Sequence, residues 1–231
     1  AQHGQFVLAN SLGFLQGYPT SRHMLSLSVI AEDKGLMQRD DWYSSARVPG
    51  ALADPESLGR YAGERALARL RARKIPTCQA PVLLEAPVAA GLIGSFVSAA
   101  SGGNLYRKSS FLLDALGRKV FAAGVRIDER PHEPRGLASA AFDEEGVATR
   151  ARTVVDNGEL TGYFLGSYSA RKLGMKSTGS AGGTHNLVVA ANGPDFRGML
   201  QRLRRGLLVT ELLGQGVNLV TGDYSRGAAG Y

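Results

Sequence analysis

The sequence predicts an α+β fold that is rich in strands, with largely antiparallel sheets and a few packed helices. Apolar and polar residues alternate in short segments, as in half-buried strands, and turn residues join neighbouring segments into hairpins. The expected helices do not alternate regularly with these strands, as they would in a doubly wound parallel sheet. The 231-residue chain is 44% hydrophobic, which excludes a mainly disordered protein and allows a sizeable core.

The first fifty residues are expected to form strands and turns. A short apolar run over 6–9 is followed by turn-prone residues at 10–13. Alternation over 25–30 indicates a half-buried strand, residues 32–35 form a turn, and 36–42 can return beside it. This part of the chain should therefore contain an antiparallel hairpin.

A helix is expected next, because Asp54 can cap its start and Pro55 suits the first helical position. Pro76 should end this helix. Its apolar stripe comprises Leu58, Tyr61, Ala62, Ala66, Leu67 and Leu70. These residues predict an amphipathic helix that covers another layer.

The segment 74–77 is the expected domain boundary, because a compact strand over 81–84 follows it directly. The sequence thus predicts a central region over 1–76 and a β-rich C-terminal domain over 77–231. A second helix, over 87–100, is made almost entirely of small and apolar residues. Because it has no strongly polar face, we expect it to be buried and to let neighbouring backbones come close.

The rest of the chain is expected to be rich in strands. Asn157-Gly158 lies between two β-prone runs over 153–161 and supplies the positive φ angles of a type I′ hairpin. Further elements are expected as helices over 168–173 and about 194–205, and as strands over 207–212 and 217–221.

The chain carries 27 basic and 20 acidic residues, a net charge of +7 that could serve nucleic acid or an acidic partner. Most of the basic residues fall in helix-like stretches without interleaved aromatic residues, which a single-strand-binding surface would require. Solvated helix faces are therefore favoured over nucleic-acid binding. The two clusters are Arg60, Arg65, Arg69, Arg71, Arg73 and Lys74, and Arg197, Arg202, Arg204 and Arg205.

Cys78 is the only cysteine, which excludes an intrachain disulfide framework and suits a reducing compartment. With no adjacent His or Lys in sequence, it is expected to be a small buried residue rather than a nucleophile. No run of eighteen apolar residues could span a bilayer. The chain starts at Ala1 without a leader pattern, so either the start was processed or this is a piece of something longer.

No independent catalytic pattern is evident. The glycine-rich segment 178–185 lacks the Lys-Ser/Thr ending of a P-loop and is expected to be a closely packed turn. No two histidines have helical ligand spacing; a distant pairing of His132 with His185 stays open, with structural hydrogen bonds favoured for each. The acidic segment 143–145 could supply paired carboxylates, and an exposed acidic turn is the favoured alternative. The pentapeptide G-x-S-x-G does not occur.

Five blocks of the sequence resemble the PmbA/TldD family, on the PmbA (TldE) side. Members were formerly called modulators of DNA gyrase and are now regarded as metalloprotease components. The blocks are 106–112, 142–150, 167–174, 177–187 and 214–227, and the resemblance runs from about Ala9 to Tyr231. Family members are about twice this length, so an N-terminal α/β domain and a tail beyond Tyr231 are expected to lie outside this sequence.

The resemblance implies a heterodimer in which the TldD subunit carries zinc on an H-E-x-x-x-H helix, with a later cysteine. In this sequence Gly94, Ser95 and Ala99 stand where His, Glu and His would stand. The chain is therefore expected to have no catalytic residues and no zinc or other cofactor of its own, the zinc being held by the partner. The residues expected to bind peptide or line a chamber are Arg171, Ser180, His185 and Asn186.

The expected function is that of a cytoplasmic, non-catalytic subunit in proteolysis of unfolded peptides and maturation of peptide precursors. Its partners would be a TldD-type subunit and an unfolded peptide, which strand edges in the last hundred residues could accept by β-augmentation. In isolation the chain could form a homo-oligomer; no membrane or nucleic-acid partner is expected. Two alternatives stay open, a self-sufficient peptidase with an unrecognised site and a regulatory binding module for nucleic acid or gyrase.

Overall fold

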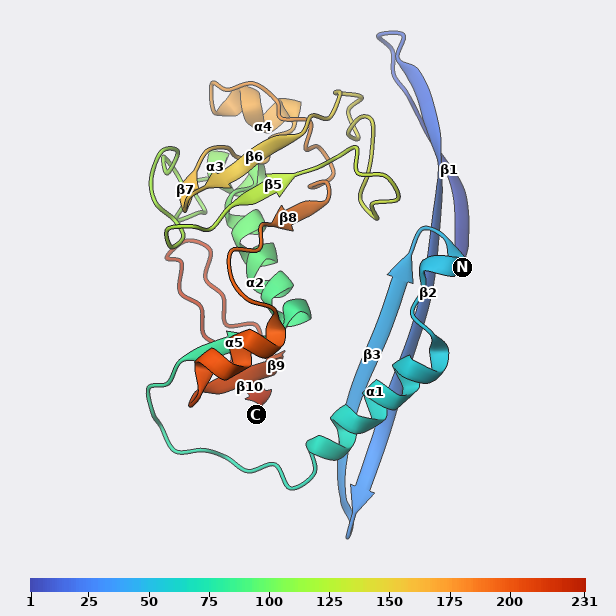
Figure 1. The fold of residues 1–231 in the computed structure, drawn as a ribbon. Coiled ribbons are helices and arrows are strands. Elements are labelled where there is room, and N and C mark those ends of the chain that lie inside the picture. Colours follow the sequence, from blue (N-terminus) through green and yellow to red (C-terminus); the bar gives the residue numbers. More distant parts are fainter. The chain divides into compact units, whose positions relative to one another are not determined.

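The computed structural model describes all residues, 1–231, and the chain forms two compact units (Figure 1). The first unit comprises residues 1–78 together with 135–137, and the second comprises 79–134 and 138–231. The α+β class expected from the sequence is confirmed, with antiparallel pairing in most of the strand contacts.

The first unit contains a three-stranded antiparallel sheet in the order β1-β2-β3. The strands are β1 (Gln2–Ala9), β2 (Leu15–Asp33) and β3 (Leu36–Ala46). β1 pairs only with the first part of β2, from Leu15 to Arg22, whereas β3 pairs with the remainder, from His23 to Asp33. The hairpin expected between 25 and 42 is confirmed, and it is longer than the sequence pattern indicated.

Helix α1 (Pro55–Ala68) packs on β2 and β3, after the short 3₁₀ helix η1 (Pro49–Ala51). As expected, Asp54 caps α1: its Oδ2 accepts a hydrogen bond from the Ser57 amide at 2.8 Å. The Trp42 ring meets Tyr61 edge-on at 4.8 Å, so the helix is held by aromatic packing. α1 ends at Ala68 rather than near Pro76, because Arg71 adopts a φ of +63°, which a helix cannot continue.

The second unit contains two small sheets. In the first, β4 (Val82–Leu84) pairs in parallel with β9 (Leu207–Leu213), and β10 (Gly227–Gly230) pairs antiparallel on the other side of β9. The second sheet is antiparallel, in the order β7-β6-β5-β8. Its strands are β5 (Ile127–Glu129), β6 (Arg152–Asp156), β7 (Glu159–Leu160) and β8 (Leu187–Val189).

The expected strand over 217–221 is wrong. The Asn218 side chain accepts hydrogen bonds from the amides of Val220 and Thr221, and this local bonding turns the chain away from an extended path. A single bridge joins Val217 to Tyr224, and the last strand of the chain is β10.

The hydrophobic core of the second unit lies around helix α2 (Ala86–Ala99), which Figure 1 shows between the two sheets. Three further helices are α3 (Gly102–Tyr106), α4 (Ser167–Lys172) and α5 (Phe196–Leu203). The fully buried apolar side chains include Leu105, Leu112, Ile127, Val154, Val155, Leu160 and Leu165. No helix is both long and apolar enough to cross a membrane.

The Asn157-Gly158 hairpin is confirmed. It joins β6 to β7 with φ angles of +46° and +83°, as a type I′ turn requires. The Asn157 Oδ1 also accepts a hydrogen bond from the Gly124 amide at 2.7 Å. An added Cβ at Gly158 would lie 2.5 Å from the Phe121 carbonyl oxygen, so this glycine is required by space as well as by φ.

Two expectations about burial are wrong. Only Phe96 and Ala99 of α2 are buried, because the helix exposes one side of its small-residue surface. Cys78 is exposed, since the segment between α1 and β4 has no regular structure and no layer covering it. Close packing of a neighbour occurs instead at Gly102, where an added Cβ would lie 2.2 Å from the side-chain Oγ of Ser169.

Candidate functional site

The three α2 residues that replace the expected zinc ligands have different surroundings. Gly94 is exposed, and an added Cβ would meet nothing within 4 Å. Ser95 Oγ donates a hydrogen bond to the Gly91 carbonyl oxygen at 3.3 Å. Ala99 has no exposed surface, and its carbonyl oxygen accepts a 2.6 Å hydrogen bond from Ser110 Oγ. The close packing expected along this helix is therefore found at Ala99 and absent at Gly94.

Ser95 lines a cavity of about 150 Å³ beside α2. Aromatic and aliphatic side chains form most of its wall: Leu92, Phe96, Phe111, Leu112, Val120, Phe121, Val217, Leu219 and Tyr224. A cavity with such walls offers almost no donor for a cation.

The most strongly buried charge of the second unit is the Glu129 carboxylate, on β5. Its side chain is 2% exposed, and its Oε2 accepts a hydrogen bond from Arg152 Nε, on β6, at 2.7 Å. Its Oε1 accepts from the His185 amide at 2.9 Å and lies 3.2 Å from His185 Nδ1. Because an ionised carboxylate only accepts, Nδ1 carries the proton and donates.

These contacts decide the ionisation of Glu129. Burial would by itself raise the pKa of this carboxyl, because a low dielectric disfavours the charged form. The hydrogen bonds from His185 and the positive charge of Arg152 outweigh that effect, and the pKa of Glu129 is lowered. The group is thus a fixed anion with its partners already in place. Arg152 Nη2, by contrast, is buried and has no hydrogen-bond partner.

The acidic segment 143–145 does more than form an exposed turn. Asp143 is 3% exposed, and its Oδ1 accepts hydrogen bonds from the amides of Glu145 and Val147, each at 2.9 Å. Its Oδ2 accepts from the Ala181 amide at 3.0 Å. The expectation of exposure is correct for Glu144 and Glu145 and wrong for Asp143, which joins two of the distinctive sequence blocks.

The glycine-rich segment 178–185 is a packed turn, as expected. The amides of Thr178 and Ser180 both donate to the Leu165 carbonyl oxygen, at 3.0 and 3.3 Å. Gly182 adopts a φ of +88°, which favours glycine, and its backbone lies close to the exposed end of the Glu144 side chain. These amides are already bonded and do not form a phosphate cradle.

The four residues expected to bind peptide differ in their availability. Ser180 Oγ bonds Thr178 Oγ1 at 3.0 Å, and His185 bonds Glu129. The Asn186 Nδ2 donates to Arg130 O and Ser139 Oγ, and its Oδ1 accepts from the Ala138 amide. Arg171 is exposed on α4 and has no such partner. Their assignment to peptide binding stays a prediction.

No group of three or more His, Cys, Asp or Glu residues could hold a metal ion. His132 Nε2 lies 3.0 Å from Thr149 Oγ1, and that hydroxyl donates to the Ala140 carbonyl oxygen, so Nε2 carries the proton. His3 and His23 meet edge-on at 5.1 Å in the first unit. Each histidine thus has a structural contact.

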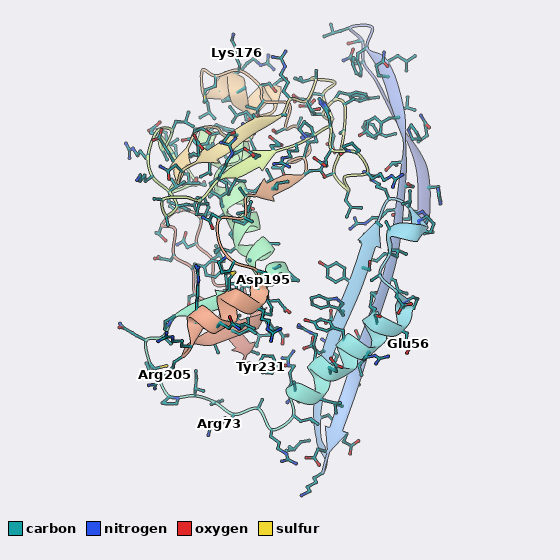
Figure 2. The ribbon with its side chains drawn as sticks, viewed as in Figure 1. Glu56, Arg73, Lys176, Asp195, Arg205 and Tyr231 are labelled. Atoms are coloured by element: carbon teal, nitrogen blue, oxygen red, sulfur yellow. The ribbon has the colours of Figure 1, made fainter.

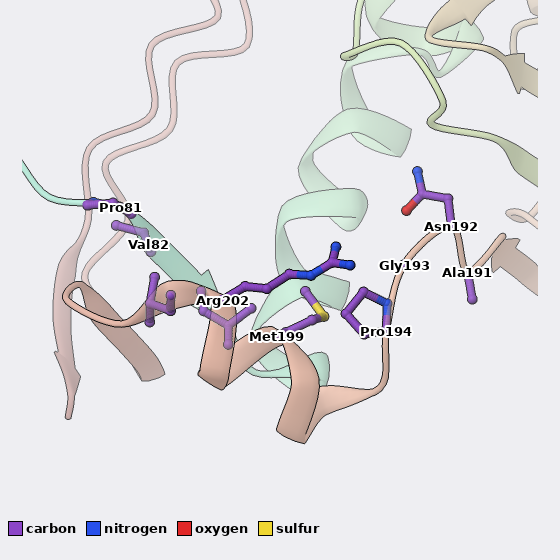
Figure 3. A pocket seen from close by; sticks show the side chains of 10 residues that line it. Pro81, Val82, Ala191, Asn192, Gly193, Pro194, Met199 and Arg202 are labelled. Atoms are coloured by element: carbon purple, nitrogen blue, oxygen red, sulfur yellow. The ribbon is translucent and has the colours of Figure 1, made fainter.

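A larger pocket, about 560 Å³, lies between the start of β4, the segment 191–194 and helix α5 (Figure 3). Figure 2 shows Asp195 at the start of α5 and Arg205 just past its end. The strand side of this pocket is fixed by β4–β9 pairing, and the helix is capped by Asp195, whose Oδ1 accepts from the Gly198 amide at 2.8 Å. Sequence reasoning found the helix but not the pocket, because the β4 side of the pocket is far in the sequence from the segment 191–203 that forms the other side.

Comparison with known proteins decides the family. The PmbA/TldA metallopeptidase C-terminal domain matches residues 77–231, and the central domain of the same family matches residues 1–70. The chain belongs to the PmbA/TldD family. The resemblance found in the sequence is therefore confirmed.

Several relatives of the PmbA/TldD family match most of this chain. It is 51% identical to Metalloprotease PmbA of Escherichia coli O157:H7, over 100% of this chain and 51% of that protein. It is 47% identical to a Metalloprotease PmbA homolog of Haemophilus influenzae, over 99% of this chain and 51% of that protein. The chain thus spans about half the length of these curated relatives.

Solved structures of the family share the fold. A Thermotoga maritima protein described as a proposed modulator of DNA gyrase has a TM-score of 0.89 and 32% identity, covering 98% of this chain and 54% of its own. TldE from Thermococcus kodakarensis has a TM-score of 0.81 at 22% identity, covering 92% of this chain and 50% of its own. The likeness to TldE shows the PmbA/TldD fold alone.

Proposed function

We propose that the chain is a PmbA/TldE-type, non-catalytic subunit of a TldD/TldE metalloprotease. The complex would act in proteolysis of unfolded peptides and in maturation of peptide precursors. Membership of a metallopeptidase family supports the protease context. A cytoplasmic location is part of the proposal, and the single cysteine, which forms no disulfide, supports it.

The observation that carries this proposal is the side-chain chemistry of α2. Zinc binds nitrogen, sulfur and carboxylate oxygen donors, usually three or four of them. Gly94 and Ala99 have no donor atom, and the Ser95 hydroxyl bonds within its own helix. The residues at these positions do not fit a zinc ion. We therefore assign zinc, and the hydrolytic step, to a TldD-type partner.

The role proposed for this chain is to hold substrate and support the partner. β8 and β10 are edge strands in their sheets, and an extended peptide could pair with such an edge. Both edges are short, three and four residues, so side-chain contacts must add to the main-chain bonds. Arg171, which is exposed and unpaired on α4, is one candidate for such a contact.

The test combines this chain with a TldD-type subunit and measures cleavage of an unstructured peptide, with and without a zinc chelator. We expect cleavage only when both subunits are present, its loss on chelation, and stoichiometric zinc only in the partner. An inactive partner variant without its zinc-helix histidines is the control, and this chain should not restore its activity.

Two other outcomes would replace the proposal. Chelator-sensitive cleavage by this chain alone would favour a self-sufficient peptidase. DNA binding that weakens steeply with salt, without any effect on cleavage by the partner, would favour a regulatory nucleic-acid module.

A further inference from the structure

The pocket between β4, the segment 191–194 and α5 has the size and walls of a ligand site. Its volume of about 560 Å³ lies in the usual range for pockets that bind small molecules. Val82 is 56% exposed and Met199 is 41% exposed, so large apolar side chains at this pocket face solvent. We call this site the α5 pocket.

Three segments give the α5 pocket a fixed shape. Val82 and Leu83 belong to β4, which is paired with β9. Asn192 Nδ2 donates to the Gly124 carbonyl oxygen at 3.0 Å and so anchors the segment 191–194. Pro194 directly precedes the Asp195 cap, and an added Cβ at Gly198 would lie 2.7 Å from its side chain, so the end of this segment packs against the first turn of α5.

One cation is available to a ligand in this pocket. Figure 3 shows Arg202 extending from α5 across the pocket, toward the segment that carries Asn192 and Pro194. Arg202 forms no ion pair and no hydrogen bond. A guanidinium presents several donors in a planar fork and binds carboxylates by two parallel hydrogen bonds. The ligand therefore needs an anionic group beside an apolar one.

The surrounding charges point the same way. Arg197, Arg204 and Arg205 lie on or just after α5, and none of them has a carboxylate partner. Asp195 is the only acidic residue in 194–206, and its Oδ1 is used in the helix cap. The positive potential around the pocket would attract an anion.

A second polar group in the pocket, the Asn192 side chain, favours one class of carboxylate ligand over others. Because the Asn192 Nδ2 is bonded to Gly124, its Oδ1 is left as an acceptor. An acceptor and a cation that line the same pocket suit a ligand that has a carboxylate and an N–H donor on the same carbon. The C-terminal residue of a peptide has this combination, whereas a simple fatty acid lacks the N–H group.

We propose that the α5 pocket binds the C-terminal residue of a peptide. Its α-carboxylate pairs with Arg202, its amide N–H donates to Asn192 Oδ1, and its apolar side chain lies between Val82 and Met199. The proposal rests on the proposed function in so far as a peptide is the substrate. It adds two points to the proposed function: this chain recognises the C-terminal end of the peptide, and the terminal residue is apolar.

The test compares three ligands on the 231-residue chain. The first is a labelled, unstructured peptide that ends in leucine with a free carboxylate, and the second is the same peptide as its C-terminal amide. The third is 4-methylpentanoate, which keeps the leucine side chain and carboxylate but lacks the N–H. Fluorescence anisotropy gives Kd for both peptides, and competition gives Kd for the free acid.

We expect the free-carboxylate peptide to bind at least about tenfold more tightly than its amide, as charge-assisted hydrogen bonds from Arg202 should provide. Arg202→Gln should weaken the free-carboxylate peptide by a similar factor and leave the amide unchanged. Arg197→Gln is the matched control, because it removes the same charge from the same helix but does not line the pocket. Thermal unfolding of both variants should match that of the unchanged chain.

Equal affinity for the free-carboxylate peptide and its amide would overturn the proposal. Equal losses of affinity for the free-carboxylate peptide in Arg202→Gln and Arg197→Gln would overturn it too. Competition by 4-methylpentanoate as strong as that of the peptide would show a site for free carboxylic acids and overturn the peptide assignment. These outcomes are independent of the partner assay. If this chain does not support cleavage by TldD and the acid–amide difference persists, the proposed function fails alone.

Discussion

Arg152 Nε donates a 2.7 Å hydrogen bond to Glu129 Oε2, and this pair joins two neighbouring strands inside the second unit. The two residues are 23 positions apart in sequence. His185, a further 33 positions on, completes the contact from the glycine-rich segment. Three parts of the chain therefore depend on one buried carboxylate.

Glu129→Gln should lower the free energy of unfolding by about 3–5 kcal/mol, the usual cost of leaving one partner of a buried ion pair uncompensated. The measurement is chemical denaturation at neutral pH. Glu133→Gln, at an exposed side chain, is the control and should change stability by less than about 0.5 kcal/mol. Equal, small effects of the two substitutions would contradict the role given to Glu129.

The same carboxylate predicts a pH dependence. The pKa of Glu129 is lower in the folded state than in the unfolded state. The contribution of this carboxylate to folding stability is therefore fully present above the unfolded pKa. That contribution is lost as the pH falls through the folded pKa. Stability of the unchanged chain should thus decrease on acidification more steeply than stability of Glu129→Gln. Denaturation midpoints taken between neutral pH and pH 3 give the comparison, and parallel curves would refute it.

Gly94→Ala should stabilise the chain by about 0.5–1 kcal/mol, because alanine is the better helix former and its Cβ would meet open space. Gly102→Ala should destabilise it, because the new methyl would meet Ser169 Oγ within 2.2 Å. Urea midpoints of the two variants should move in opposite directions. A loss of stability in Gly94→Ala would mean that this side of α2 is covered in solution.

Restoring the family's ligands on α2 should not create a zinc site. Gly94→His has room, whereas Ala99→His would overpack a position with no exposed surface and cost about 1–3 kcal/mol or more. Elemental analysis of the combined variant with Ser95→Glu should find no stoichiometric zinc. The single variants separate the causes: Ala99→His should carry nearly all of the destabilisation. A stable combined variant that binds zinc and cuts peptide would overturn this view of α2.

Asn157→Val should destabilise the chain by about 1 kcal/mol or more, since a β-branched residue resists the φ of +46° and the bond to the Gly124 amide is lost. Asn157→Gly is the matched variant, because it keeps the positive φ and loses only the side-chain bond. Thermal midpoints should therefore fall in the order unchanged chain, Asn157→Gly, Asn157→Val. Indistinguishable midpoints would exclude a structural role for this turn.

The elements that could be predicted from the sequence are those whose geometry depends only on residues close together in the chain. The cap at Asp54 and the Asn157-Gly158 turn depend on a few neighbouring residues, so their geometry follows from residue type. β5 and β8, each three residues long, gave no such signal. They are strands only because they pair with each other and β5 pairs with β6.

The candidate sites could be predicted less well than the fold. The sequence identified His185 and the acidic segment, but it could not show that Glu129 and Asp143 are the buried carboxylates that organise them. Those bonds join residues 38 and 56 positions apart. The α2 surface was misjudged for a related reason: small apolar residues suit a buried helix, but only tertiary contacts decide which side of it is covered.

The divided pairing of β2 has a consequence for local opening of the first unit. From His23 onward, β2 pairs with β3, and α1 packs on both of these strands, whereas Leu15–Arg22 pairs with β1, which contains no buried residue. Amide protons bonded between β1 and β2 should consequently exchange with deuterium at a lower opening free energy than those between β2 and β3. One continuous strand would thus contain two stretches that unzip separately, with the limit between Arg22 and His23.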